Sequence, residues 1–194
     1  MRSVERQITL NGTAPILFDR YPGTNDSKDI PPEKKCYLTQ DSHLYLPAIN
    51  IMSFLAAETG SAPTVCLGKQ GKSIAAALAA SVSINPFEIP FTRDGKPIVF
   101  GEFVESADGQ ISDPLSGMTI VGHVARVKKA GLSIPNPKIR PMLSPPWALS
   151  FKLSIAPHEK LSETLVEDLF TRGGQYIGLG TFRRFYGKFN FCWK

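Results

Sequence analysis

Long apolar segments are missing from this 194-residue sequence. A transmembrane helix needs roughly 20 consecutive apolar residues, and no run of that length occurs, so none is predicted. The first six residues, from Met1 to Arg6, include three charged side chains and lack the apolar core of a secretory signal. We therefore expect a cytoplasmic protein without a membrane partner.

Cysteine is scarce, with only Cys36, Cys66 and Cys192, which lie far apart. An odd, scattered set favours buried free thiols in a reducing compartment over a disulfide framework. No Cys-x-x-Cys pair occurs, and the three histidines have no metal-ligand spacing among themselves. No metal site and no cofactor are expected.

Acidic residues are absent after Asp168, and this gives the chain an uneven charge. Residues 1–121 contain 10 Lys/Arg and 13 Asp/Glu, whereas residues 122–194 contain 12 and 4. A one-sided positive field attracts a polyanion and steers its approach. Binding of a polyanion is the favoured interpretation, and a merely solvated basic surface is the alternative.

The composition is that of a soluble globular protein, with 42% apolar and 20% charged residues. The length suits one domain over residues 1–194. Local patterns predict strands at 7–10, within 97–127 and at 147–155, a hairpin at 37–45, and helices after Pro47 and at 73–80. Gly, Pro and polar residues predict loop insertions near 21-35 and 131-146, the second around Pro135-Asn136-Pro137.

The last third has the clearest patterns. Alternation from Trp147 to Ile155 predicts a strand with one apolar face. Ser162 is the expected N-cap of a helix with an apolar stripe, and Gly173-Gly174 is expected to end that helix. A second alternating run, from Phe185 to Trp193, predicts a terminal strand.

The segment between that helix and strand carries the functional prediction. Its glycines permit positive φ and close approach to a partner, and successive open backbone N–H groups would bind an anion. Two arginines can fork onto phosphates, and four aromatic rings, two of them Tyr176 and Phe185, offer stacking surfaces for unpaired bases. Under the alternative interpretation, the glycines only form turns and the rings are core. The predicted nucleic-acid-binding residues are Gly178, Gly180, Phe182, Arg183, Arg184, Tyr186, Gly187 and Lys188.

Two motifs resemble the RAMP superfamily, which supplies RNA-gripping subunits of CRISPR effector complexes. Tyr45-Leu46-Pro47-Ala48 is similar to its strand-to-helix opening, and Gly178-Leu179-Gly180 followed by Tyr186-Gly187-Lys188-Phe189 is similar to its C-terminal glycine-rich loop. The chain also resembles small phage and prophage proteins with an ordered set of short motifs. These motifs fall here at Leu44 to Ala48, Arg140-Pro141, Trp147 to Ile155 and Gly178 to Phe189.

The resemblance implies an α+β fold with a ferredoxin-like (RRM/RAMP-type) βαββαβ core. It also implies a surface for RNA or single-stranded DNA, self-association along the strand, and the cytoplasm of a bacterial host if the protein is phage-encoded. Binding roles carry over to Gly178, Gly180, Arg183, Gly187 and Lys188. The proline-rich insert from Pro135 to Pro146 departs from the compact core of the superfamily.

Two other functions are alternatives to non-catalytic binding. A metal-independent RAMP-type endoribonuclease would use His43 as its acid or base. A protein that mimics a CRISPR subunit would bind protein partners instead. Gly68 to Ser73 resembles a phosphate-binding loop, but Cys66 stands where that motif needs glycine. The carboxylates Glu102, Glu105, Asp108 and Asp113 are interpreted as a solvated edge. We expect no enzyme activity.

Overall fold

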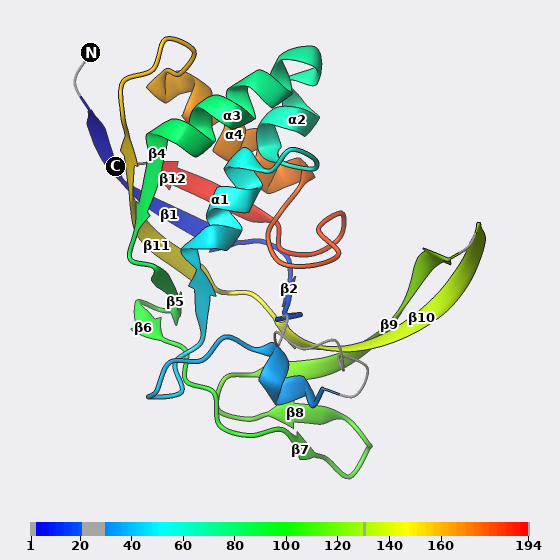
Figure 1. The fold of residues 1–194 in the computed structure, drawn as a ribbon. Helices are drawn as coiled ribbons and strands as arrows, with labels where there is room; N and C mark the ends of the chain where they lie inside the picture. The colour runs from blue at the N-terminus through cyan, green and yellow to red at the C-terminus, as the bar shows by residue number, and fades with distance from the viewer. Residues whose placement is uncertain (1–2, 21–29, 130, 194) are drawn as a thin grey trace.

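The structure, a computed structural model, describes residues 3–20, 30–129 and 131–193, with the backbone alone at 125–129, 132 and 134. The fold is a mixture of helices and antiparallel sheets. Figure 1 shows a body in which helices pack against a sheet, and a long hairpin that curves away from it.

The larger sheet has the strand order β12-β1-β11-β5-β3, and all its pairs are antiparallel. The short strand β4 pairs with one end of β11, and β6 pairs with β5. Ile8 at the centre of β1 lies opposite Phe151 of β11 and Trp193 of β12. The bounds are β1 (Val4–Gly12), β3 (Tyr45–Pro47), β4 (Val82–Asn85), β5 (Glu88–Arg93), β6 (Lys96–Pro97), β11 (Ala148–Ile155) and β12 (Phe189–Trp193).

Strand β11 follows its sequence pattern closely. Leu149, Phe151 and Leu153 are buried, whereas Ser150 and Lys152 between them are exposed. Successive side chains of a strand point to opposite faces, so one face of β11 enters the core and the other meets solvent. The predicted strand at 147–155 is confirmed, although β11 begins one residue later.

Helices α1 (Ala48–Ala56), α2 (Ala62–Cys66), α3 (Gly71–Ser81) and α4 (Glu163–Tyr176) form a layer on the larger sheet (Figure 1). Phe54 of α1 has its ring centroid 5.6 Å from those of both Phe170 in α4 and Phe189 in β12. Phe170 in turn stacks on Phe191 at 5.1 Å. These rings join the helices to the sheet in one apolar core. No helix in the described residues is both long and apolar enough to cross a membrane.

Helix α4 begins as predicted but ends later. The Ser162 hydroxyl accepts a hydrogen bond of 3.1 Å from the Leu165 amide, which confirms the N-cap. The prediction that Gly173-Gly174 ends the helix is wrong, because α4 continues to Tyr176. Both glycines lie at tight contacts: a Cβ at Gly173 would lie 2.4 Å from the Phe54 ring, and one at Gly174 would lie 2.5 Å from the Phe189 carbonyl oxygen.

The smaller sheet has the order β2-β10-β9-β8-β7 and is also antiparallel. Strands β9 and β10 pair over their whole length and form the hairpin that projects from the body in Figure 1. Met118 and Leu143, opposite each other at its base, are buried in the core. The bounds are β2 (Ile16–Leu17), β7 (Val104–Glu105), β8 (Ile111–Asp113), β9 (Met118–Lys129) and β10 (Leu132–Leu143).

The predicted loop insertion at 131-146 is wrong over most of its length, because residues 132–143 form β10. Proline lacks the N–H that a ladder hydrogen bond requires, so three prolines favoured a loop. However, Pro135, Pro137 and Pro141 are separated by even numbers of residues, so their nitrogens all face the same side of the strand. That side faces away from β9, because the Pro141 carbonyl, on the same side as its nitrogen, accepts a hydrogen bond from the Phe18 amide next to β2. Strands tolerate proline where no ladder hydrogen bond from its nitrogen is needed.

The other predicted insertion, 21-35, lies partly outside the described residues, since residues 21–29 are among those omitted. Residues Pro32–Lys35 form a 3-10 helix, η2. The predicted hairpin follows, with Leu38 bridged to Leu44. Cys36 is buried, and burial raises the pKa of its thiol to about 12, so it stays protonated. Cys66 is half-buried and Cys192 is exposed, so the expectation of buried free thiols holds for Cys36 alone.

Candidate nucleic-acid interface

The glycine-rich loop, residues 177–188, connects α4 to β12 and is closed by its own backbone. The Leu179 amide donates to the Gly187 carbonyl at 2.9 Å, and the Gly187 amide donates to Pro15 at 2.7 Å. At the helix end, the Ile177 and Gly178 amides both donate to the Gly173 carbonyl. The predicted row of open amides is therefore wrong for these residues, because their N–H groups already have partners within the chain.

Three glycines of the loop have positive φ, namely Gly178 (+80°), Gly180 (+77°) and Gly187 (+68°). A Cβ at Gly187 would lie 1.9 Å from the Leu179 carbonyl oxygen. A Cβ at Gly178 would lie 2.6 Å from the Tyr186 carbonyl oxygen. These positions require glycine because two stretches of backbone meet there. Their role in the described structure is to shape the loop.

Phe182 occupies the tip of the loop in a left-handed conformation, with φ of +53°. Its ring stacks on His123 of β9 at 5.3 Å, and the Arg140 guanidinium of β10 lies over it at 4.7 Å. His123 also forms a hydrogen bond of 2.7 Å with the Tyr186 hydroxyl. We call these four residues the loop clamp, because they join the glycine-rich loop to the hairpin. The clamp partly buries Tyr186 and engages its hydroxyl, whereas its ring was predicted to stack on a base.

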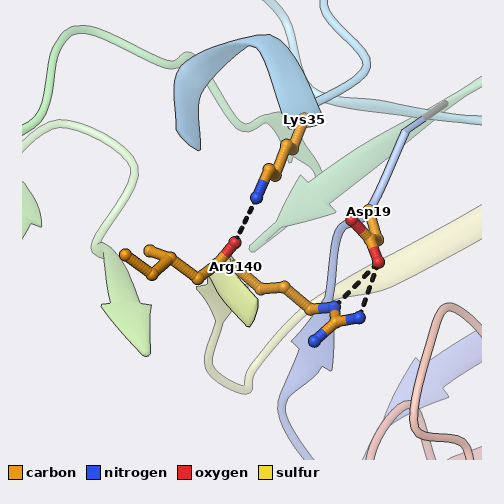
Figure 2. A network of polar contacts seen from close by, with 4 residues as sticks. Asp19, Lys35 and Arg140 are labelled. Carbon is orange, nitrogen blue, oxygen red and sulfur yellow. Dashed lines mark hydrogen bonds and ion pairs between the residues drawn. The ribbon is translucent and has the colours of Figure 1, made fainter. Parts of the chain in front are cut away.

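The Arg140 guanidinium is held in place by Asp19, as Figure 2 shows. Its Nε and Nη2 donate to Asp19 Oδ2 at 3.0 and 2.7 Å, and its side chain is only 5% exposed. Lys35 of η2 donates from Nζ to the neighbouring Ile139 carbonyl at 2.5 Å. Burial, with a smaller contribution from the Arg140 charge, lowers the pKa of Lys35 despite the opposing Asp19 carboxylate. Strand β10 is therefore held by two other segments of the chain, η2 and the stretch that follows β2.

An open pocket lies beside the loop clamp, between the end of α4, the loop tip and the α1–α2 region. Its volume is about 460 Å³. Tyr176 and Phe185 line it with rings that are 67% and 77% exposed. Large apolar side chains left this open beside one cavity are typical of a binding surface. The lining residues are Gly60, Val65, Tyr176, Ile177, Phe182, Arg183, Arg184 and Phe185.

The charge of this pocket comes from Arg183 and Arg184. The ion pairs among the described residues involve neither of them. By contrast, Arg172, also in the basic tail, is paired with Asp168 at 3.0 Å. Arg183 lies against Gly60, where a Cβ would be 3.3 Å from its Nη2. The described lining therefore combines two guanidinium groups with exposed rings and contains no carboxylate.

The structure brings together only part of the predicted set. Phe182, Arg183 and Arg184 line one pocket. Lys188 lies at the other end of the loop, where its carbonyl accepts from the Thr13 and Ala14 amides and burial lowers the pKa of its ammonium group. Their binding roles stay a prediction.

Sequence reasoning missed the far wall of the pocket and the loop clamp. Gly60 and Val65 come from the α1–α2 region, and His123 comes from β9. No local pattern marks these residues, since their contacts depend on how distant segments pack. Arg140 gave no local signal either, since Lys138 lies two residues before it in the sequence, yet only the folded structure shows Arg140 buried and paired with Asp19.

The groups considered for catalysis lie elsewhere. His43 is bridged through its backbone to Val99. Asp113 is buried and accepts hydrogen bonds from the Gly101, Leu115 and Ser116 amides and from the Ser116 hydroxyl. Burial tends to raise its pKa, but these hydrogen bonds together hold that pKa below its usual value. Asp113 is thus a structural acceptor, and no group of three potential metal ligands occurs in the described part of the chain.

Comparison with known proteins gave a structural match only. No protein-family model and no curated protein matches the sequence. A chain of the type III-B Cmr-β complex, solved by cryo-electron microscopy with cognate target RNA bound, is similar with a TM-score of 0.50. The identity is 13%, and the match covers 100% of this chain and 59% of that chain. The fold therefore resembles that of a subunit of a type III-B CRISPR complex, and our chain spans about three fifths of that subunit's length.

Proposed function

We propose that this protein binds single-stranded nucleic acid, RNA or single-stranded DNA, without catalysing a reaction. The observation that carries the proposal is the pocket in which Arg183 and Arg184, unpaired among the described residues, adjoin the exposed rings of Tyr176 and Phe185. Guanidinium groups suit phosphates, and open rings suit unpaired bases. The glycine-rich loop contributes by holding these side chains in place.

The fold supports a more specific assignment. We propose a ferredoxin-like core of the RAMP type, because the strand order β12-β1-β11-β4 has α1 to α3 between β1 and β4 and α4 between β11 and β12. The Cmr-β likeness is consistent with this core, and that neighbour belongs to a complex with bound target RNA. Assembly of copies along the strand is part of the same proposal.

Gel-shift titration of labelled single-stranded RNA, single-stranded DNA and duplex tests the proposal. The double variant Arg183→Ala plus Arg184→Ala should weaken single-strand binding by at least about tenfold, because charged hydrogen bonds are lost. Repeating the titrations across salt concentrations should show a slope shallower by about 1.4, for two lost phosphate contacts.

Lys34→Ala plus Lys96→Ala is the matched control, since it removes two exposed cations from η2 and β6. It should leave binding close to that of the parent. Equal weakening by both double variants would mean that overall charge, rather than this pocket, determines binding. Unchanged binding by the arginine variant would overturn the proposed site.

The proposal that the chain is not an enzyme needs its own experiment. Labelled RNA is incubated with the protein in EDTA, and intact RNA is expected. Cleavage that disappears in His43→Ala would establish the metal-independent ribonuclease instead. The ultraviolet absorbance ratio of the purified protein addresses a protein-binding CRISPR-subunit mimic, because co-purifying nucleic acid would argue against that role.

A further inference from the structure

The pocket beside the loop clamp differs from a simple basic surface in having apolar walls. Tyr176 stands on the last turn of α4, and Phe185 stands on the glycine-rich loop, so two separate segments supply its exposed rings. Val65 of α2, 54% exposed, adds an aliphatic wall. An electrostatic surface for a phosphate chain needs none of these groups, so their convergence requires a further explanation.

The size of the pocket and its fixed Phe182 wall restrict the kind of ligand that it can bind. A volume of about 460 Å³ falls within the range of roughly 300–1,000 Å³ that is usual for small-ligand pockets. Phe182, which lines one wall, stacks on His123 and lies under the Arg140 guanidinium. That wall is therefore fixed before any ligand arrives, and the exposed Phe185 and Tyr176 remain available to contact it. Such a site suits one planar group and cannot enclose a duplex.

We infer that this pocket takes a single unpaired nucleotide of the bound strand, with its base against the Tyr176 and Phe185 rings and its phosphate on Arg183 or Arg184. This inference rests on the proposed function and specifies its ligand. Base and phosphate together match both the apolar walls and the positive charge of the pocket. A protein side chain would match the rings, but it would leave two guanidinium groups without an anionic partner.

Substitution of the rings tests the inference separately from the proposed function. Phe185→Ala and Tyr176→Ala should each weaken single-strand binding by between about fivefold and 150-fold, the usual range for loss of one stacked base. Neither should change the salt slope, because no phosphate contact is removed. Phe87→Ala is the matched control, since Phe87 is equally exposed at 67% but does not line the pocket. It should bind like the parent.

Photocrosslinking gives a direct readout of contact. A short single strand containing 5-iodouracil is irradiated in complex with the protein, and the modified peptide is identified by mass spectrometry. The crosslink should map to Tyr176 or Phe185 and should disappear in Phe185→Leu if it forms there. Leucine keeps the apolar volume, so this variant separates loss of the aromatic face from any change in folding.

The outcomes distinguish the two proposals. If the ring variants bind like the parent and crosslinks map elsewhere, the nucleotide pocket is wrong, although binding through the arginines could still hold. If no single strand binds the parent protein at all, both proposals fall. A change in salt slope with Phe185→Ala would also overturn the inference, because the ring would then act through the charges.

Discussion

The two ends of the glycine-rich loop differ from its tip in what their residues contact. At the ends, Gly178 and Gly187 approach other backbone segments so closely that no Cβ fits. At the tip, Arg184 and Phe185 are exposed, and Phe185 is 77% so. We call Gly178 and Gly187 the frame of the loop, because their close backbone contacts set its shape. The exposed tip makes no such contacts. Glycine content alone does not locate a binding site, because here the glycines serve the frame.

Substitution of Gly187 at the end of the loop should have the greatest effect on stability. Gly187→Ala should lower the free energy of unfolding by roughly 3 kcal/mol or more, because the new Cβ would overlap the Leu179 carbonyl at a φ of +68°. Urea denaturation followed by circular dichroism measures the change.

Gly95→Ala provides the control for that experiment. Its φ is +76°, but no atom lies within 4 Å of the added Cβ. Only the backbone conformation is then penalised, by about 1–2 kcal/mol. Equal losses at both positions would show that close approach contributes nothing at Gly187.

The loop clamp is the next place to test, because it connects frame and tip to the hairpin. Asp19→Ala should lower the free energy of unfolding by about 2–3 kcal/mol, since it leaves the buried Arg140 guanidinium without its carboxylate. This value is set below the usual cost of breaking a buried pair because Asp19 is 32% exposed. Thermal unfolding measures the loss.

Glu5→Ala is the matched control for that variant. It removes a carboxylate from the Glu5–Lys152 pair, in which both side chains are about half exposed. Exposed pairs contribute little, so stability should remain nearly that of the parent. If Asp19→Ala were equally mild, the clamp would not depend on this ion pair.

These tests also mark what the sequence could and could not predict. Alternation fixed β11, and the Ser162 cap was found because both signals are local. Gly173 and Gly174 were misassigned because their requirement comes from Phe54 and Phe189, which are distant in sequence. A glycine pair in the sequence can either end a helix or allow another segment to approach the helix closely. The two cases differ only in the residue that packs against the glycines.

The candidate site also has one part that local sequence patterns predict and one part that they do not. The lack of acidic residues after Asp168 predicted a positive surface, and the ion pairs of the described residues indeed do not include Arg183 or Arg184. The shape of the pocket was unpredictable, since its walls come from α2, α4 and the loop. The even spacing of the prolines in β10 does allow a strand to be predicted. It places all three proline nitrogens on one side, so the residues that face β9 keep the N–H groups that the ladder needs.

Substitution at the exposed tip of the loop should affect stability least. Phe185→Ala should change the free energy of unfolding by no more than about 0.5 kcal/mol, because a ring 77% exposed has little packing to lose. Phe182→Ala, in the same loop, should cost more, because His123 and Arg140 contact its ring. Parallel thermal melts measure both. A large loss at Phe185 would mean that its ring belongs to the frame, and any weaker binding by that variant would then report misfolding rather than loss of a base contact.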